Sequence, residues 1–136
     1  MKELRLPLKK KWFDMTKEGI KREDYIKITP YWMSRLLLFQ GKKMGARFWA
    51  SLFLGGDYEM TLRVFVYDIS PAEIDVNTMT LGYPKRGDKE RELRYKHEGI
   101  ETREGNPEWR AEKGKVYFVI KHGEEYYEKT NEQKQL

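Results

Sequence analysis

Two kinds of hydrophobic spacing follow each other at the start of the chain. Leucines alternate with polar residues over residues 4–8, and this period of two is typical of a strand with one buried face. Residues 10–18 change to helical spacing, and Gly19 stands where a left-handed residue commonly closes a helix. The pattern therefore predicts a strand and then a short helix that ends at a glycine.

A second strand and a second helix are predicted around Pro30. The extended stretch that includes Tyr25 must end by Thr29, because the residue before a proline is pushed out of the α region. Pro30 can then open a helix, whose apolar positions continue over residues 31–40. Glycines from Gly41 onward are expected to break it.

From residue 46 the sequence becomes rich in aromatic and β-branched residues. Five candidate strands are separated mostly by turns that contain glycine. They cover residues 46–54, 59–70, 76–83, 91–104 and 115–122. We therefore expect an α+β fold, a small mixed β-barrel with two short N-terminal helices inserted between the early strands. Residues 1–125 are expected to form one domain, followed by a polar tail over residues 126–136.

The composition limits the classes of function. The 136 residues are 39% hydrophobic and 36% charged, with a net charge of +5. The first 22 residues hold eight lysines and arginines against three acidic residues, a bias that is compatible with a polyanionic partner. There is no cysteine and there are only two histidines, so neither a structural zinc nor another cofactor is expected. No apolar run approaches the length of a membrane span or of a signal peptide, and we expect a cytoplasmic protein.

The charged stretch after Gly19 is the first candidate site. Lys21 follows the predicted helix cap, which fixes the direction of the backbone and can aim the ammonium into a cleft. Asp24 lies three positions further on and could pair with it. The alternative is a solvated turn of mixed charge, and local physics favours this alternative.

A tryptophan and several pairs of basic and aromatic residues form the second group of candidates. Trp109 follows the turn sequence Gly-Asn-Pro-Glu and is either a platform for stacking on a base or a plug for one end of the core. Basic residues next to aromatic residues, as at Arg94 and Tyr95, are the combination that base stacking and phosphate contacts require. Trp12, Trp32 and Trp49 lie in amphipathic patterns and are expected in the core instead.

Two long segments carry a resemblance to a known family. KKKWFDMTKEGIKREDYIKITPYWMSRL, residues 9–36, resembles the N-terminal signature of the ASCH family, relatives of the PUA-like barrels, with its pattern Gly-x-Lys-x-x-Glu-x-Arg. Residues 80–123 resemble the C-terminal half of small ASCH proteins of phages and bacteria. The segment over residues 40–77 has no counterpart in the family pattern.

The resemblance implies a β-barrel with a cleft that takes RNA or a nucleotide. Gly19 and Lys21 match the pattern, but Asp24 stands at the glutamate position and Ile26 at the arginine position. An isoleucine cannot supply the planar fork with which arginine binds phosphate. Lys27 and Arg35 are candidates to supply the missing charge.

Some ASCH-like proteins are hydrolases that remove an acyl group from a modified cytidine with a lysine, a threonine and a glutamate. Lys21 matches the lysine, whereas Asp24 occupies the threonine position and cannot act as a hydroxyl nucleophile. The glutamate could be Glu59, Glu73 or Glu98.

The leading expectation is a module that binds RNA or a nucleotide. The residues expected in its cleft are Lys21, Asp24, Tyr25, Arg35 and Trp109. The alternatives are a small amidohydrolase that acts on a modified nucleoside with Lys21 as its catalytic residue, a nuclease of the ASCH kind without a recognisable metal site, and an accessory protein that binds a host partner.

Overall fold

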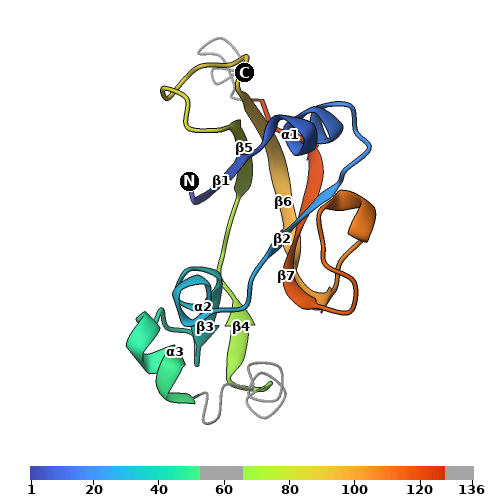
Figure 1. The fold of residues 1–136 in the computed structure, drawn as a ribbon. Helices are drawn as coiled ribbons and strands as arrows, with labels where there is room; N and C mark the ends of the chain where they lie inside the picture. The colour runs from blue at the N-terminus through green and yellow to red at the C-terminus, as the bar shows by residue number, and fades with distance from the viewer. Residues whose placement is uncertain (53–65, 128–136) are drawn as a thin grey trace. The chain divides into compact units, whose positions relative to one another are not determined.

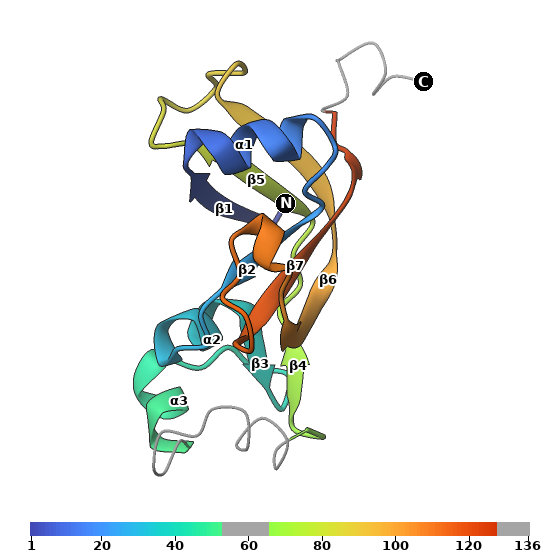
Figure 2. The same ribbon diagram turned by 45° about the vertical axis from the view of Figure 1, so that its right-hand side comes forward.

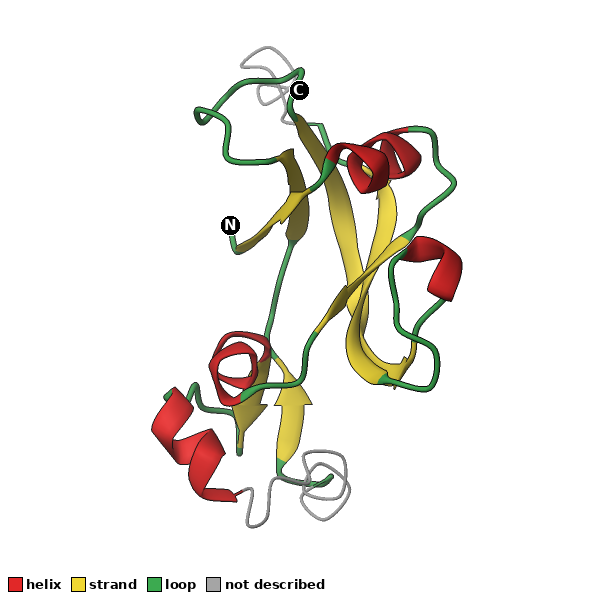
Figure 3. Ribbon diagram, in the orientation of Figure 1, coloured by secondary structure: helices red, strands yellow, loops and turns green. Residues whose placement is uncertain are grey.

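A computed structural model describes residues 1–52 and 66–127, and the fold is α+β as predicted (Figures 1 and 3). The contacts divide the chain into two compact units. Unit 1 comprises residues 1–22 and 74–98 and the described residues from 122 onward, whereas unit 2 comprises the described parts of 23–73 and 99–121. The single domain over residues 1–125 stays a prediction, and residues 128–136 of the predicted tail lie outside the described part of the chain.

Unit 1 contains the strand that the alternating leucines predict, together with two strands from later in the chain. Strand β1 (Glu3–Leu8) runs parallel to β5 (Val76–Leu81), with Glu3 opposite Val76 and Leu8 opposite Leu81. All three leucines of β1 are buried, so the predicted strand with one buried face is confirmed. Strand β5 also pairs in antiparallel fashion with β6 (Glu92–Glu104).

Helix α1 (Lys10–Lys17) packs on β5 in unit 1 (Figure 2). Phe13 joins Leu8 and Met79 in a small hydrophobic cluster. The helix ends as predicted, because Gly19 adopts φ +77° and the backbone N–H of Ile20 donates to the carbonyl of Met15 at 3.0 Å.

Unit 2 begins with β2 (Glu23–Ile26), which pairs in antiparallel fashion with β7 (Val116–Glu125). Helix α2 (Pro30–Leu36) starts at its proline as predicted, and the Thr29 hydroxyl caps it by accepting from the N–H of Trp32 at 3.2 Å.

The predicted length of this helix is wrong. Helix α2 ends at Leu36, and the chain continues as strand β3 (Leu37–Phe39), which pairs with β4 (Ile69–Pro71). A run of apolar residues satisfies helical and extended spacing equally well, and here the partner strand decides between them.

The strand predicted over residues 46–54 is also wrong where the structure describes it. Residues Ala46–Leu52 form helix α3, which lies beside α2. Trp49 is completely buried, with its ring 6.2 Å from that of Phe39 and 5.4 Å from that of Phe48. Burial of this tryptophan overrides the preference of aromatic residues for strands. Residues 53–65 lie outside the described chain, so most of the strand predicted over residues 59–70 is not tested.

The three remaining predicted strands are confirmed as β5, β6 and β7. Strands β6 and β7 contribute residues to both units, and the hydrogen-bonded order of the sheet is β1-β5-β6-β7-β2. None of the described helices is long and apolar enough to cross a membrane.

Candidate functional site

Lys21 is a buried residue of unit 1, with 2% of its surface exposed. Its backbone N–H donates to the carbonyl of Met15, which extends the helix cap. The carbonyl of the next residue, Arg22, accepts from the N–H of His122 and ties this turn to β7. The interpretation of the stretch as a solvated turn is therefore wrong for Lys21. Lysines are almost never buried to this degree unless the ammonium is paired.

Asp24 and Ile26 are buried residues of unit 2. Both lie on β2, and they are 5% and 6% exposed. Asp24 stands opposite Ile120 of β7, and Ile26 stands opposite Phe118. The isoleucine at the position of the family's arginine is thus a core residue of this protein.

Tyr25 supports a loop. Its hydroxyl donates to Glu23 Oε2 at 2.5 Å and accepts from the backbone N–H of Asn106 at 2.9 Å. Burial and the hydrogen bond to Glu23 raise the pKa of Tyr25 to about 12, so this hydroxyl stays protonated near neutral pH. Its ring lies 5.8 Å from that of Tyr117, and Gly105 has no side chain where a Cβ would lie 2.7 Å from the Tyr25 ring.

An ionic network in unit 2 begins at Glu23, the partner of this tyrosine. Arg103 donates to both carboxylate oxygens of Glu23, at 2.7 and 3.1 Å, and also to Glu101. Lys121 donates to the other carboxylate oxygen of Glu101 at 3.2 Å. Burial opposes ionisation of Glu23, but the hydrogen bonds from Arg103 and Tyr25 leave its pKa lowered. The network is internally paired, and we assign it a structural role.

Trp109 and Arg35 occupy different parts of unit 2. Trp109 is half-buried in a 3-10 turn (Pro107–Trp109), which the Asn106 side chain caps by accepting from the N–H of Glu108. Arg35 is exposed on α2, where its guanidinium lies 5.7 Å from the ring of Tyr31. The structure therefore joins Tyr25 to the loop that carries Trp109, whereas Lys21 belongs to unit 1. The convergence of all five predicted residues on one cleft stays a prediction.

The candidates for a catalytic glutamate also separate. Glu98 is exposed in unit 1, and its side chain lies over Gly123, where a Cβ would come within 2.7 Å of it. Glu73 belongs to unit 2. Glu59 lies outside the described residues.

Unit 1 contains a groove of about 400 Å³ that no sequence pattern predicted. We call it the unit 1 groove. It is formed by the loop after β5, the start of β6 and the end of β7. Its lining residues are Gly87, Lys89, Glu92, Leu93, Arg94, Glu125, Tyr126 and Tyr127. Two cations, two carboxylates and two tyrosines therefore face one space of the size of a small-molecule site.

Arg94 is held in position at this groove. Its guanidinium lies 4.9 Å from the ring of Tyr126, and its NH2 group lies 3.3 Å from Glu3 Oε2. The same oxygen of Glu3 accepts from the hydroxyl of the buried Thr78 at 2.8 Å. The backbone also joins the two strands here, because the N–H of Tyr126 donates to the carbonyl of Arg94 at 2.9 Å.

The outer part of the unit 1 groove consists of exposed side chains. Tyr127 is 74% exposed, and its hydroxyl donates to Glu125 Oε2 at 2.6 Å. This hydrogen bond raises the pKa of the Tyr127 hydroxyl. Lys89 is exposed in the loop before β6. The available sequence signals were the pair Tyr126-Tyr127 and the neighbours Arg94 and Tyr95, but nothing in sequence places them beside Lys89.

The interior of unit 1 contains a second polar arrangement. Asn77 is completely buried between two imidazoles, with Nδ2 2.9 Å from His122 Nδ1 and Oδ1 2.7 Å from His97 Nδ1. An amide nitrogen donates and an amide oxygen accepts, so His122 Nδ1 carries the lone pair and His97 Nδ1 carries the proton. Burial, followed by repulsion from His122, lowers the pKa of His97.

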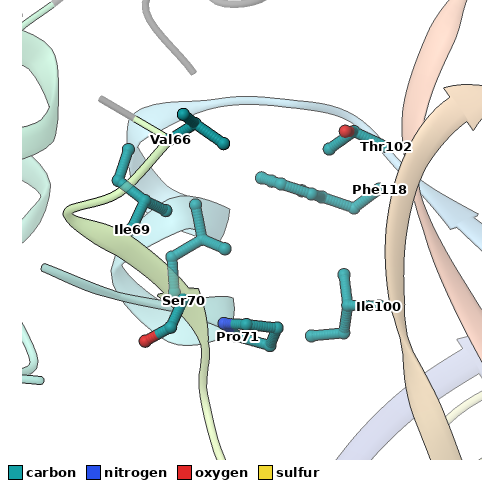
Figure 4. Close-up of a pocket in the computed structure, with 8 residues that line it drawn as sticks. Val66, Ile69, Ser70, Pro71, Ile100, Thr102 and Phe118 are labelled. Atoms are coloured by element: carbon teal, nitrogen blue, oxygen red, sulfur yellow. The ribbon is translucent and has the colours of Figure 1, made fainter. Parts of the chain in front are cut away.

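Unit 2 has a smaller and more apolar pocket, of about 160 Å³ (Figure 4). Phe118 and Ile100 face Ile69 and Pro71 across this space. Its size suits an apolar side chain or a very small molecule and is too small for a nucleotide.

Comparisons with known proteins identify no relative, since no family model, no curated protein and no solved structure matches the chain. Within the described residues, no group of three or more histidine, aspartate or glutamate side chains is arranged to hold a metal ion. The site must therefore be interpreted from its own chemistry. In the unit 1 groove that chemistry is aromatic and cationic, with one exposed carboxylate, that of Glu125.

Proposed function

We propose that the protein binds RNA or a nucleotide through the unit 1 groove. The observation that carries the proposal is the placement of the exposed Tyr127 and the stacked pair Arg94–Tyr126 around one groove of about 400 Å³. Aromatic faces that stack on bases, next to cations that meet phosphates, are the recurring elements of single-strand recognition.

The charge of unit 1 supports this proposal. Lys89 lines the groove, and the exposed Lys9, Lys11 and Lys17 belong to the same unit. Contacts from such lysines to phosphates release counterions, so the affinity should fall steeply with salt. Arg94 is less free to move than these lysines, because Glu3 and Tyr126 hold it, and less entropy is lost when it binds.

We further propose that the fold is a PUA-like barrel of the ASCH kind. The support is the order of β1, α1, a capping glycine, a buried Lys21 and β2, together with the five-stranded sheet. In this proposal, the cleft built from Lys21, Asp24, Tyr25, Arg35 and Trp109 is a second candidate for the RNA site. The core position of Ile26 makes it a cleft without the arginine of the family pattern.

A titration with a labelled single-stranded RNA octamer tests the proposal and separates the two sites. Fluorescence anisotropy is measured at about 50 and about 200 mM salt. We expect Tyr127→Ala to weaken binding by about tenfold, because one base loses its stacking partner. Lys89→Ala should weaken binding and lower the salt slope by about one.

Matched controls are available in the same unit. Tyr83 is 93% exposed, Lys85 is exposed, and neither lines the groove. Tyr83→Ala should bind like the wild type, and Lys85→Ala should weaken binding less than Lys89→Ala does. Equal effects of Tyr83→Ala and Tyr127→Ala would contradict the groove, and a loss confined to Arg35→Ala would assign binding to the second candidate site, which includes Arg35, instead.

A second candidate function is favoured by the burial of Lys21. A lysine that is only 2% exposed at the family's lysine position is compatible with a small amidohydrolase acting on a modified nucleoside. The test is incubation of the wild type and of Lys21→Met with a panel of acylated nucleosides, followed by chromatography. Turnover by the wild type that Lys21→Met abolishes, while its thermal unfolding shows it still folded, would support the hydrolase. An RNA included in the same panel tests the nuclease alternative by its cleavage.

A further inference from the structure

The unit 1 groove contains a carboxylate that phosphate binding does not explain. Its two carboxylates differ in their surroundings. Glu92 accepts from Arg5 at 2.8 Å, and only 11% of its side chain is exposed. Glu125 is exposed, and it accepts from the Tyr127 hydroxyl through Oε2. Glu125 is therefore the carboxylate that a ligand in the groove would meet.

The hydrogen bond between Tyr127 and Glu125 fixes the carboxylate relative to the aromatic ring. A base that stacks on the ring of Tyr127 would have its edge near the hydroxyl end of that ring, where Glu125 is held. An ionised carboxylate only accepts hydrogen bonds. It would therefore accept from the exocyclic amino group of cytosine, adenine or guanine and would repel the O4 carbonyl of uracil.

The cations of the groove complete the arrangement. Lys89 and Arg94 provide positive charge for the phosphate, which the carboxylate of Glu125 would repel. The volume of about 400 Å³ is suited to one nucleotide. In a duplex, both faces of the base are stacked and its amino group is paired, so neither Tyr127 nor Glu125 could reach them.

We infer that the unit 1 groove selects one unpaired nucleotide whose base carries an exocyclic amino group, and that Glu125 reads this group. The inference rests on the proposed function, since it requires that the groove binds RNA. It adds a preference against uracil and against double-stranded RNA.

The test compares labelled oligocytidine and oligouridine octamers, because the two bases differ chiefly in the amino group and the carbonyl at one ring position. We expect the wild type to bind oligocytidine about tenfold more tightly than oligouridine. Glu125→Gln should bring the two affinities within about threefold of each other, because the amide can donate to uracil as well as accept from cytosine. Glu124→Gln is the matched control, since the Glu124 carboxylate binds Lys96 and does not line the groove.

Each outcome separates the inference from the proposed function. Tight and equal binding of both octamers by the wild type would overturn the inference and leave RNA binding in place. Binding of neither octamer would overturn both. If the preference for oligocytidine survives in Glu125→Gln, or is lost in Glu124→Gln, Glu125 is not the residue that recognises the amino group. Duplex RNA bound as tightly as oligocytidine would overturn the selection of an unpaired nucleotide.

Discussion

The two units bury different kinds of side chain. Most of the polar and charged residues buried in the described chain belong to unit 1: Thr16, Lys21, Asn77, Thr78, Thr80 and His122. In unit 2 the buried residues are mainly apolar: Ile26, Met33, Leu36, Leu37, Trp49, Ala72, Ala111, Tyr117, Phe118, Val119 and Ile120, with Asp24 as the charged member. Within the described residues, unit 1 buries these polar residues beside six apolar ones, so its interior depends on the direction of hydrogen bonds as well as on packing. The interior of unit 2 depends mainly on how well its side chains fill space.

This difference bears on function because hydrogen bonds connect the buried polar residues of unit 1 to the groove at its surface. The buried Thr78 donates to Glu3, and Glu3 holds Arg94 at the groove. A binding residue that is fixed through a second residue to the interior keeps its position before the ligand arrives. The apolar pocket of unit 2 offers no comparable chain of polar contacts within its described lining.

The largest effect is expected from Trp49→Ala in unit 2. The side chain is completely buried against Phe39 and Phe48, so its loss leaves a large cavity. We expect the free energy of unfolding to fall by about 3–5 kcal/mol in chemical denaturation. Trp49→Phe is the control and should cost much less. The indole N–H of Trp49 is buried without an acceptor among the described residues, so replacing the indole with a phenyl ring removes no hydrogen bond seen there.

The corresponding change in unit 1 removes hydrogen bonds instead of volume. Asn77→Leu keeps the size of the side chain but leaves His97 Nδ1 and His122 Nδ1 without the partner that joins them. We expect a loss of about 2–3 kcal/mol, because buried polar groups are left unsatisfied. Val76→Ala, which shortens a fully buried apolar neighbour on the same strand, measures the cost of lost packing alone. A loss below about 1 kcal/mol for Asn77→Leu would contradict the dependence of unit 1 on hydrogen bonds.

Two glycines provide a third comparison between the units. In Gly105→Ala the new Cβ would lie 2.6 Å from the Cβ of Ala111 and 2.7 Å from the Tyr25 ring in unit 2, and neither atom can move freely. In Gly123→Ala it would meet the exposed side chain of Glu98 in unit 1, which can move away. We expect losses of about 1–3 kcal/mol for Gly105→Ala and less than about 1 kcal/mol for Gly123→Ala in thermal unfolding. Equal losses would show that the close contacts in unit 2 relax as readily as those of an exposed glutamate.

The sequence predicted correctly those elements whose hydrophobic pattern fits only one kind of secondary structure. Alternating leucines specify the strand β1, and a glycine after a helical pattern specifies the end of α1, because local sterics decide both. Residues 37–39 and 46–52 were predicted wrongly, since their apolar and aromatic runs satisfy more than one period. Only pairing with β4 and the burial of Trp49 decide between these periods, and both depend on residues distant in sequence.

The candidate site was less accessible to sequence analysis than the fold. The position of Lys21 after the capping glycine could be predicted, but its burial could not, because charged stretches usually form solvated surface. The unit 1 groove combines Lys89 with Arg94 and Tyr127 through the pairing of β6 with β7. No local pattern contains that pairing. The role of Tyr25 was likewise hidden, because its hydroxyl binds the backbone of Asn106.

The smallest expected effect is a loss of stability on mild acidification that starts in unit 1. Burial lowers the pKa of His97, so the unfolded chain binds the proton at a higher pH than the folded chain does. Stability is therefore complete above the ordinary histidine pKa of about 6.5 and decreases as the pH falls below it. Repulsion from His122 also lowers the pKa of His97, whereas the charge of Asp75 raises it. The Asn77 amide turns its oxygen to His97 and its NH2 group to His122, so it accepts a proton from only one of the two Nδ1 atoms.

Hydrogen exchange followed by mass spectrometry between about pH 7 and pH 5.5 measures this effect in each unit separately. Protection factors should fall in peptides from β5 and the start of β6, and those of α2 and α3 should change less. The variant His97→Gln keeps a donor for Asn77 Oδ1 but does not titrate, so its unit 1 peptides should lose less protection over the same range. If His97→Gln and the wild type respond alike, the acid sensitivity of unit 1 arises elsewhere than from the pair of imidazoles on Asn77. A parallel loss in both units would instead mean that they unfold together, and the contrast between a polar and an apolar interior would then have no separate consequence for stability.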